Sequence, residues 1–164
     1  MTRPLTGLRV VDCSTGTAGP RATGMLADYG ADVIWVEPPG GDRFHGELEI
    51  PYAVFNRGKR GIVLDLKDDS GKERMYQLLA TADVFVESWQ PGVAERLGLG
   101  WEVLHQRFPG LVHTSITGFG PDGPYRDLPG YESLVHAIAG STAEQAGHRP
   151  GPIYQALPFA SRAS

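Results

Sequence analysis

The residues best suited to chemistry in this chain are those that could bind a phosphate group. Gly16-Thr17-Ala18-Gly19-Pro20 follows an apolar run and precedes a predicted helix. Backbone N–H groups at a helix N-terminus favour a bound anion. The segment matches neither the G-x-G-x-x-G pattern nor a P-loop, so a simple tight turn is the alternative interpretation.

A cluster of cations is the second candidate. The segment Asn56 to Gly61 contains Arg57, Lys59 and Arg60, and another lysine, Lys67, follows the next apolar run. Such a cluster could neutralise the phosphates of a nucleotide, but a run of charges is more often a solvated turn. The composition leaves both interpretations open.

Residues typical of nucleophilic or metal chemistry form no recognisable pattern. Cys13 is the only cysteine; it excludes an intrachain disulfide, and its place after an apolar run predicts a small buried residue rather than a nucleophile. The histidines show no ligand spacing, so we predict no metal site. Ser161 lacks the G-x-S-x-G pattern that exposes a hydrolase nucleophile.

Alternating apolar runs and helical patterns must position these residues. The runs are continuous, which is typical of strands buried on both faces of a parallel sheet. The helices carry recognisable ends, such as Gly30 after the first and a capping box from Ser70 to Glu73 in the second. We predict strands in 8–11, 33–36, 62–66, 84–86 and 111–116, and helices in 20–29, 70–82 and 131–139.

This alternation predicts the α/β class, with an open Rossmann-like sheet of mostly parallel strands and right-handed helical crossovers. A ligand of such a sheet lies beyond the carboxyl ends of its strands. The loops expected there are 13–19, 37–44, 87–92 and 117–130, and the length of the last favours a functional role.

The composition excludes several functional classes. The chain has 164 residues, 41% of them hydrophobic, and a net charge of -4, which is typical of a globular protein and offers no basic surface to nucleic acid. No segment approaches the roughly 20 apolar residues of a membrane span, and the N-terminus lacks a signal-peptide pattern. We expect a cytoplasmic protein.

Seven segments, taken in order, resemble the family III CoA-transferases, the group that contains formyl-CoA transferase, carnitine CoA-transferase and α-methylacyl-CoA racemase. The resemblance spans essentially residues 1–164 and implies the N-terminal, CoA-binding part of the family's large domain. The small domain and the C-terminal return segment would be absent, so the fold would be incomplete relative to the family. The matching segments are 4–12, 18–20, 26–34, 56–60, 82–84, 91–98 and 117–124.

By this resemblance, CoA or acyl-CoA would bind as a substrate at the carboxyl edge of the sheet, and no cofactor would be held covalently. Lys67 and Arg96 match cationic contacts to the CoA phosphates. Leu64 and Trp89 match apolar contacts to the adenosine portion. Thr17 falls in the loop that lines the thiol end.

The catalytic positions depart from the family pattern. Family transferases attack the acyl-CoA thioester with an Asp carboxylate, and that position falls on Ser161, whose hydroxyl is a poor nucleophile without a base. The racemase histidine falls on Tyr131. Glu132 is the nearest remaining carboxylate. Ser88 replaces an Asn that sits beside the nucleotide in some members.

Three functional hypotheses follow. The first is a chain that binds CoA or acyl-CoA and whose transferase chemistry is lost or supplied by another chain. The second is a non-catalytic scaffold subunit that pairs with an active homologue. The third is an active transferase that uses Glu132 as its nucleophile. The resemblance also implies a homodimer or pairing with a homologous chain, and the identity of the acyl group stays open.

Overall fold

The chain forms two compact units, Met1–Ile116 and Thr117–Ser164. The computed structural model describes residues 3–42, 49–144 and 151–153. The first unit holds a β-sheet with its helices, and the second holds a loop followed by two short helices. Each unit is described by itself below.

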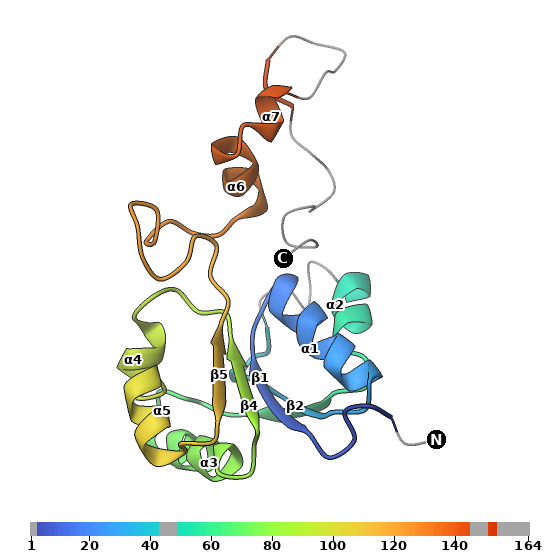
Figure 1. The fold of residues 1–164 in the computed structure, drawn as a ribbon, viewed down its shortest axis with the longest axis vertical. Helices are drawn as coiled ribbons and strands as arrows, with labels where there is room; N and C mark the ends of the chain where they lie inside the picture. The colour runs from blue at the N-terminus through green and yellow to red at the C-terminus, as the bar shows by residue number, and fades with distance from the viewer. Residues whose placement is uncertain (1–2, 43–48, 145–150, 154–164) are drawn as a thin grey trace. The chain divides into compact units, whose positions relative to one another are not determined.

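A five-stranded sheet forms the centre of the first unit, in the order β3-β2-β1-β4-β5. All four neighbouring pairs are parallel, as the continuous apolar runs predicted, and Figure 1 shows their arrangement. The strands are β1 (Arg9–Cys13), β2 (Asp32–Glu37), β3 (Arg60–Val63), β4 (Val84–Glu87) and β5 (Val112–Ser115).

Helices cover both faces of this sheet, so the predicted open α/β architecture is confirmed. In Figure 1, α1 and α2 lie on one side of the strands and α3, α4 and α5 on the other. The helices are α1 (Ala18–Asp28), α2 (Glu49–Phe55), α3 (Asp69–Leu79), α4 (Val93–Leu97) and α5 (Trp101–Arg107).

Alternating side chains of the central strands build two apolar clusters. Val11 and Phe85 belong to a cluster that includes Met75 and Leu79 of α3. Their neighbours Val10 and Val86 belong to a second cluster, which includes Ala27 of α1. Because successive side chains of a strand point to opposite faces, each central strand joins both layers of helices.

The edge strands differ from the prediction. Every residue of β3 is exposed, and three of the four residues of β5 are exposed, so the expectation that these runs are buried on both faces is wrong. Within the described residues, each of these strands has one neighbouring strand instead of two. An apolar run therefore predicted the strand but not its place in the sheet.

The helix ends test the sequence patterns residue by residue. Gly30 follows α1 with φ 105°, a left-handed conformation that glycine adopts without strain, so the predicted stop is confirmed. The predicted capping box is wrong, because the cap of α3 is Asp68, whose side chain accepts a hydrogen bond from the Ser70 amide. Hydrogen bonds, first that of the Ser70 hydroxyl, lower the pKa of Asp68.

The second unit contains the predicted loop 117–130, followed by α6 (Glu132–Ile138) and α7 (Ser141–Glu144). The two ends of the loop touch, because a Cβ added to Gly118 would lie 2.3 Å from Gly130 Cα. Tyr131 and Ala139 flank α6 as its caps, which confirms the predicted helix. None of the helices in the described ranges combines the length and hydropathy needed to cross a bilayer.

A charge cluster at the amino ends of the strands yields a test of the fold. Asp32, at the start of β2, forms ion pairs with Arg9 at 2.9 Å and with Arg60 at 2.7 Å. Burial opposes ionisation of Asp32, but the hydrogen bonds from Arg60 and Arg9 outweigh it and lower its pKa. The cluster therefore stabilises the fold only while Asp32 is ionised.

We predict that Asp32→Asn lowers the free energy of unfolding at pH 7 by no more than about 1 kcal/mol, because solvent screens ion pairs as exposed as these. The pKa is lower in the folded state, so the stabilisation is complete above the unfolded value and disappears as pH falls through the folded value. Urea titrations from pH 7 to pH 2 measure this. A difference from the wild type that persists at the lowest pH contradicts the prediction, and the exposed Asp122→Asn controls for loss of one charge.

Candidate functional site

The strand order creates a topological switch point at the carboxyl edge of the sheet. The neighbouring strands β1 and β4 are followed by connections that lead to opposite sides, towards β2 and β5 respectively. In open α/β sheets, ligands bind outside the carboxyl ends of the strands at such a switch point. The turns that follow β1, β3 and β4 are therefore the candidate site.

Side-chain hydrogen bonds hold the turn that follows β1. Asp12 Oδ1 accepts hydrogen bonds from the Ser14 amide at 2.9 Å and from the Ser14 hydroxyl at 2.5 Å. The Thr15 amide donates to Ser88 Oγ at 2.8 Å. Ser88 thus connects the turn after β1 with the turn after β4.

The turn after β4 is held in the same way. Glu87, the last residue of β4, is 2% exposed, and its Oε2 accepts a hydrogen bond from the Trp89 amide at 2.7 Å. The half-buried Trp89 ring lies edge-on to Phe85, with 6.1 Å between the ring centroids. Glu87 and Phe85 together fix the position of the Trp89 indole.

The turn after β3 carries two of the predicted contact residues. The Leu64 amide donates to the Glu37 carbonyl at 2.9 Å, and the Leu64 side chain is 4% exposed within the core cluster. The Lys67 amide donates to Asp65 Oδ1 at 2.9 Å, while the residue itself is exposed. Leu64 therefore supports the turn from the core, and Lys67 presents a charge to solvent.

Arg96 lies on α4, which follows the turn after β4. The residue is exposed, and its Nη1 lies 3.4 Å from the place where a Cβ would stand on Gly92. The guanidinium is thus beside the turn that leads from β4 into α4. Neither Lys67 nor Arg96 forms an ion pair with any residue that the structure describes.

The three cations of the segment Asn56 to Gly61 are all paired with aspartates. Lys59 pairs with Asp12 and its side chain is 1% exposed. Arg57 pairs with Asp28. Arg60 pairs with an aspartate at the start of β2, at the opposite edge of the sheet. Lys59 is therefore held in a buried ion pair, whereas Arg57 and Arg60 are paired at the surface, with side chains 53% and 63% exposed.

Thr17 occupies the N-cap position of α1 but makes no side-chain capping bond. The preceding turn, which contains Ser14, passes very close to the helix, because a Cβ added to Gly19 would lie 2.3 Å from Ser14 Cβ. The glycine at position 19 is therefore required by this close approach. The segment forms a tight turn that leads into the N-terminus of α1.

Cys13 is a structural residue, as predicted. It is 4% exposed at the end of β1. Burial raises the pKa of its thiol well above the ordinary value, and the charges of Asp12 and Glu87 raise it further. A thiol held in its protonated form is a poor nucleophile.

The remaining catalytic candidates belong to the second unit. Glu132 opens α6, and His136 Nε2 lies 3.0 Å from its Oε1. His136 Nδ1 lies 2.7 Å from the Ser141 hydroxyl. Glu132 is therefore part of a contact network within its own unit. Its negative charge also lies at the N-terminus of α6, where the helix dipole stabilises it. Ser161 lies outside the described residues.

Two buried carboxylates, Asp12 and Glu87, organise the site and were not singled out from the sequence. Both are acidic residues near the end of a run of buried apolar residues, and each accepts the amide of the residue two positions later. That pattern is a usable signal. A carboxylate is costly to bury unless hydrogen bonds and charges compensate it.

A third carboxylate, Glu37, ends β2. Its Oε1 accepts hydrogen bonds from the Tyr52 hydroxyl at 2.8 Å and from the Asp42 amide at 3.2 Å. Burial raises the pKa of Tyr52, and the hydrogen bond and charge of Glu37 raise it further. Glu37 is thus engaged with α2 and the loop that follows β2. In the described part of the chain, no group of three or more His, Cys, Asp and Glu residues is placed to hold a metal ion.

Comparison with known proteins identifies the family. Residues 5–161 match the model of CoA-transferase family III. The chain belongs to this family. Formyl-CoA:oxalate CoA-transferases resemble this family III chain at 41% identity over 160 residues in Rhodopseudomonas palustris and at 43% over 159 residues in Bradyrhizobium diazoefficiens. These alignments cover 93% and 92% of the chain but 37% of either relative.

Solved structures of similar proteins agree with the fold of this family III chain. A hypothetical protein from Mycobacterium tuberculosis is 37% identical with a TM-score of 0.93, and the match covers 98% of this chain and 46% of that one. A CAIB/BAIF family protein from Brucella suis is 34% identical with a TM-score of 0.91, with the same coverage. The described fold is therefore the N-terminal portion of a larger family architecture.

The turn that carries Lys67 in this family III chain depends on a second close approach. A Cβ added to Gly71 would lie 1.9 Å from the Asp65 carbonyl oxygen. We predict that Gly71→Ala lowers the free energy of unfolding by about 1–3 kcal/mol through overpacking, although alanine is the better helix former. Chemical denaturation measures the loss.

Gly61→Ala is the matched control for Gly71→Ala. A Cβ added at this position on β3 meets no atom within 4 Å. We expect Gly61→Ala to leave the stability within about 0.5 kcal/mol of the wild type, as is usual for surface substitutions. Equal stability of the two variants would contradict the prediction, because it would show that the turn after β3 shifts to accommodate the added methyl group.

Proposed function

We propose that this chain binds CoA or acyl-CoA at the carboxyl edge of its sheet. The observation that carries the proposal is the contrast among the cations. Lys67 and Arg96 follow β3 and β4 at this edge and have no carboxylate partner among the described residues, whereas Lys59 and Arg60 are paired. Exposed cations at the carboxyl edge of an open α/β sheet are suited to an anionic nucleotide.

The nucleotide end of CoA would meet the turns after β3 and β4. Lys67 and Arg96 would contact the phosphates, and the half-buried Trp89 ring would contact the adenosine portion. Leu64 would contribute through the core that supports the turn. The thiol end would extend towards Thr17, at the start of α1. Membership of a CoA-transferase family supports this assignment.

The related chemistry is the transfer of CoA between carboxylic acids. The names of the relatives make formyl-CoA and oxalate the first pair of substrates to test. We propose that this chain does not form the acyl-enzyme intermediate itself, because Ser161 offers a hydroxyl where the family uses a carboxylate. A paired homologous chain would supply that step, and we place the protein in the cytoplasm.

We predict that calorimetric titration detects CoA binding that weakens for dephospho-CoA, which lacks the 3′-phosphate. Lys67→Met and Arg96→Met should each raise the Kd for CoA by about tenfold to a hundredfold, because charge-assisted hydrogen bonds contribute about 1.5–3 kcal/mol. The difference from the wild type should shrink at high salt, because both cations are exposed.

Arg60→Met is the matched control, because its guanidinium is paired with an aspartate at the amino edge of the sheet. We expect it to leave the Kd for CoA unchanged. A folded wild-type chain that binds no CoA would contradict the proposal and favour a non-catalytic scaffold subunit. Equal loss of affinity in Arg60→Met and Lys67→Met would place the phosphates elsewhere.

Glu132 provides a separate test of catalysis. We predict that incubation with acyl-CoA, followed by peptide mapping, finds no covalent adduct on Glu132, because its carboxylate is engaged with His136. An adduct on the wild-type chain that disappears in Glu132→Gln would establish the alternative hypothesis of an active transferase. Labelling that survives the substitution would exclude Glu132 as the nucleophile.

A further inference from the structure

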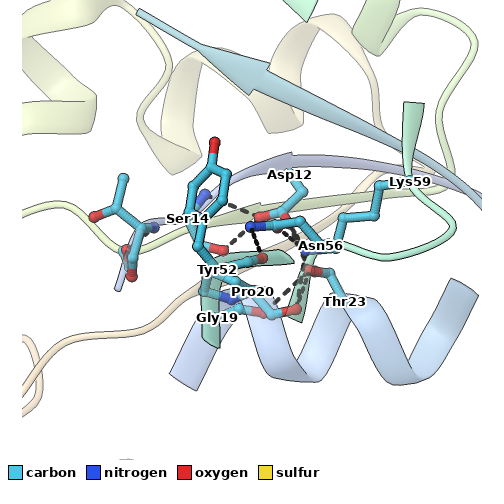
Figure 2. A network of polar contacts seen from close by, with 10 residues as sticks. Asp12, Ser14, Gly19, Pro20, Thr23, Tyr52, Asn56 and Lys59 are labelled. Carbon is cyan, nitrogen blue, oxygen red and sulfur yellow. Dashed lines mark hydrogen bonds and ion pairs between the residues drawn. The ribbon is translucent and has the colours of Figure 1, made fainter. Parts of the chain in front are cut away.

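The cationic group of Lys59 is fully occupied inside the first unit. Its Nζ donates to Asp12 Oδ2 at 2.9 Å, to the Pro20 carbonyl at 2.9 Å and to Asn56 Oδ1 at 2.8 Å. An ammonium group has three protons to donate. Figure 2 shows the Lys59 side chain extending into this network, with its partners around the ammonium group.

The Asp12 carboxylate is equally saturated. Its Oδ2 accepts the Thr23 hydroxyl at 2.5 Å in addition to Lys59, and its Oδ1 accepts both the amide and the hydroxyl of Ser14. An ionised carboxylate has about four acceptor sites. The side chain of Asp12 is 0% exposed, so water cannot replace any donor that is lost.

This saturated pair connects segments that are far apart in the sequence. Asp12 belongs to β1, Pro20 to the first turn of α1, and Asn56 to the segment between α2 and β3. Asn56 Nδ2 donates in turn to the Tyr52 carbonyl of α2 at 3.0 Å. The ammonium of Lys59 therefore connects the end of β1 with the start of α1 and the end of α2.

The turn after β1 has little freedom to move around this pair. The Ser14 side chain is pressed against α1, since a Cβ at Gly19 would overlap it. The next amide, that of Thr15, donates to Ser88 in the turn after β4. A shift of Ser14 would leave an acceptor site of buried Asp12 empty and would disturb the contact between the two turns.

We propose that Lys59 is a positioning residue of the CoA site: by compensating Asp12, it fixes the turn from Ser14 to Thr17 and, through Ser88, the turn that carries Trp89. This inference rests on the proposed function for the identity of the ligand. It assigns Lys59 no contact with CoA. Burial lowers the pKa of Lys59, and the charge and hydrogen bond of Asp12 oppose that shift.

Lys59→Met tests the proposal, because methionine has a similar length and no charge. Removing one partner of a buried ion pair leaves the other uncompensated. We expect the Ser14 and Thr15 amides to exchange hydrogen about tenfold faster or more, as a locally opened segment does, when exchange is followed by NMR. The Kd should rise by about the same factor for CoA and for dephospho-CoA.

Val33→Ala is the control for a general loss of stability. Val33 is 1% exposed on β2 and belongs to the core cluster with Val10, and its truncation leaves a cavity. We expect it to lower the melting temperature but not to accelerate exchange at Ser14 and Thr15 selectively. Equal acceleration in Lys59→Met and Val33→Ala would reduce Lys59 to a stabilising residue and overturn the proposal.

The two ligands separate positioning from direct contact. If Lys59→Met abolished the preference for CoA over dephospho-CoA, Lys59 would be a phosphate ligand and the proposal would be overturned. If the wild-type chain bound neither ligand, the proposed function would fail, but the exchange measurements would still decide whether Lys59 fixes the turn.

A second variant covers the case in which Lys59→Met does not fold. Asp12→Asn combined with Lys59→Met removes both charges, and replacing a complete buried pair is far less costly than breaking it. We expect this variant to fold, because no charge is left buried without its partner. If neither variant folded, Lys59 would do more than compensate Asp12, and the proposal would be overturned.

Discussion

The charge of a buried carboxylate is the constraint on which this structure depends. The Asp12 carboxylate accepts hydrogen bonds from four donors and is not exposed to water. An uncompensated charge in such a place would cost several kcal/mol. Satisfying it requires Ser14 from the following turn, Thr23 from α1 and Lys59 from a distant segment. The architecture of the central carboxyl edge follows from meeting that requirement.

The second buried carboxylate, Glu87, is compensated by fewer hydrogen bonds among the described residues. Its Oε2 accepts the Trp89 amide, and the Nε2 atom of His113 lies 3.7 Å from its Oε1. That Nε2 is a buried side-chain atom without a hydrogen-bond partner in the described structure. Asp12 therefore supports a rigid turn, while Glu87 sits in a less saturated setting beside Phe85 and His113.

Among the described residues, the cations of the first unit include both paired and unpaired side chains. Those that hold the fold, such as Lys59 and Arg60, are paired with aspartates of β1 and β2. Lys67 and Arg96 are exposed on the turns or helices after β3 and β4. The chain spans about 37% of the length of the curated relatives it matches, so these elements are one part of a larger family architecture. The exposed edge strands β3 and β5 belong to the same incomplete arrangement.

The sequence by itself determined the strands, the main helices and the family. Continuous apolar runs need only local hydrophobicity to predict strands, and Gly30 stops α1 through its own backbone freedom. Lys67, Trp89 and Arg96 could be named because they match family positions, and the parallel sheet places their turns at the predicted edge. These features depend on neighbouring residues or on an ordered set of motifs.

Only the tertiary structure decided which charges are paired and which runs are covered. In the sequence, Lys59 is indistinguishable from the other cations of its segment. Its partner Asp12 is 47 residues away, so the local sequence does not predict the pair. The exposure of β3 and β5 depended on sheet order, since a strand with one neighbour has the same apolar residues as a central one. Long-range contacts set these outcomes, because burial and pairing are properties of the assembled fold and not of the local sequence.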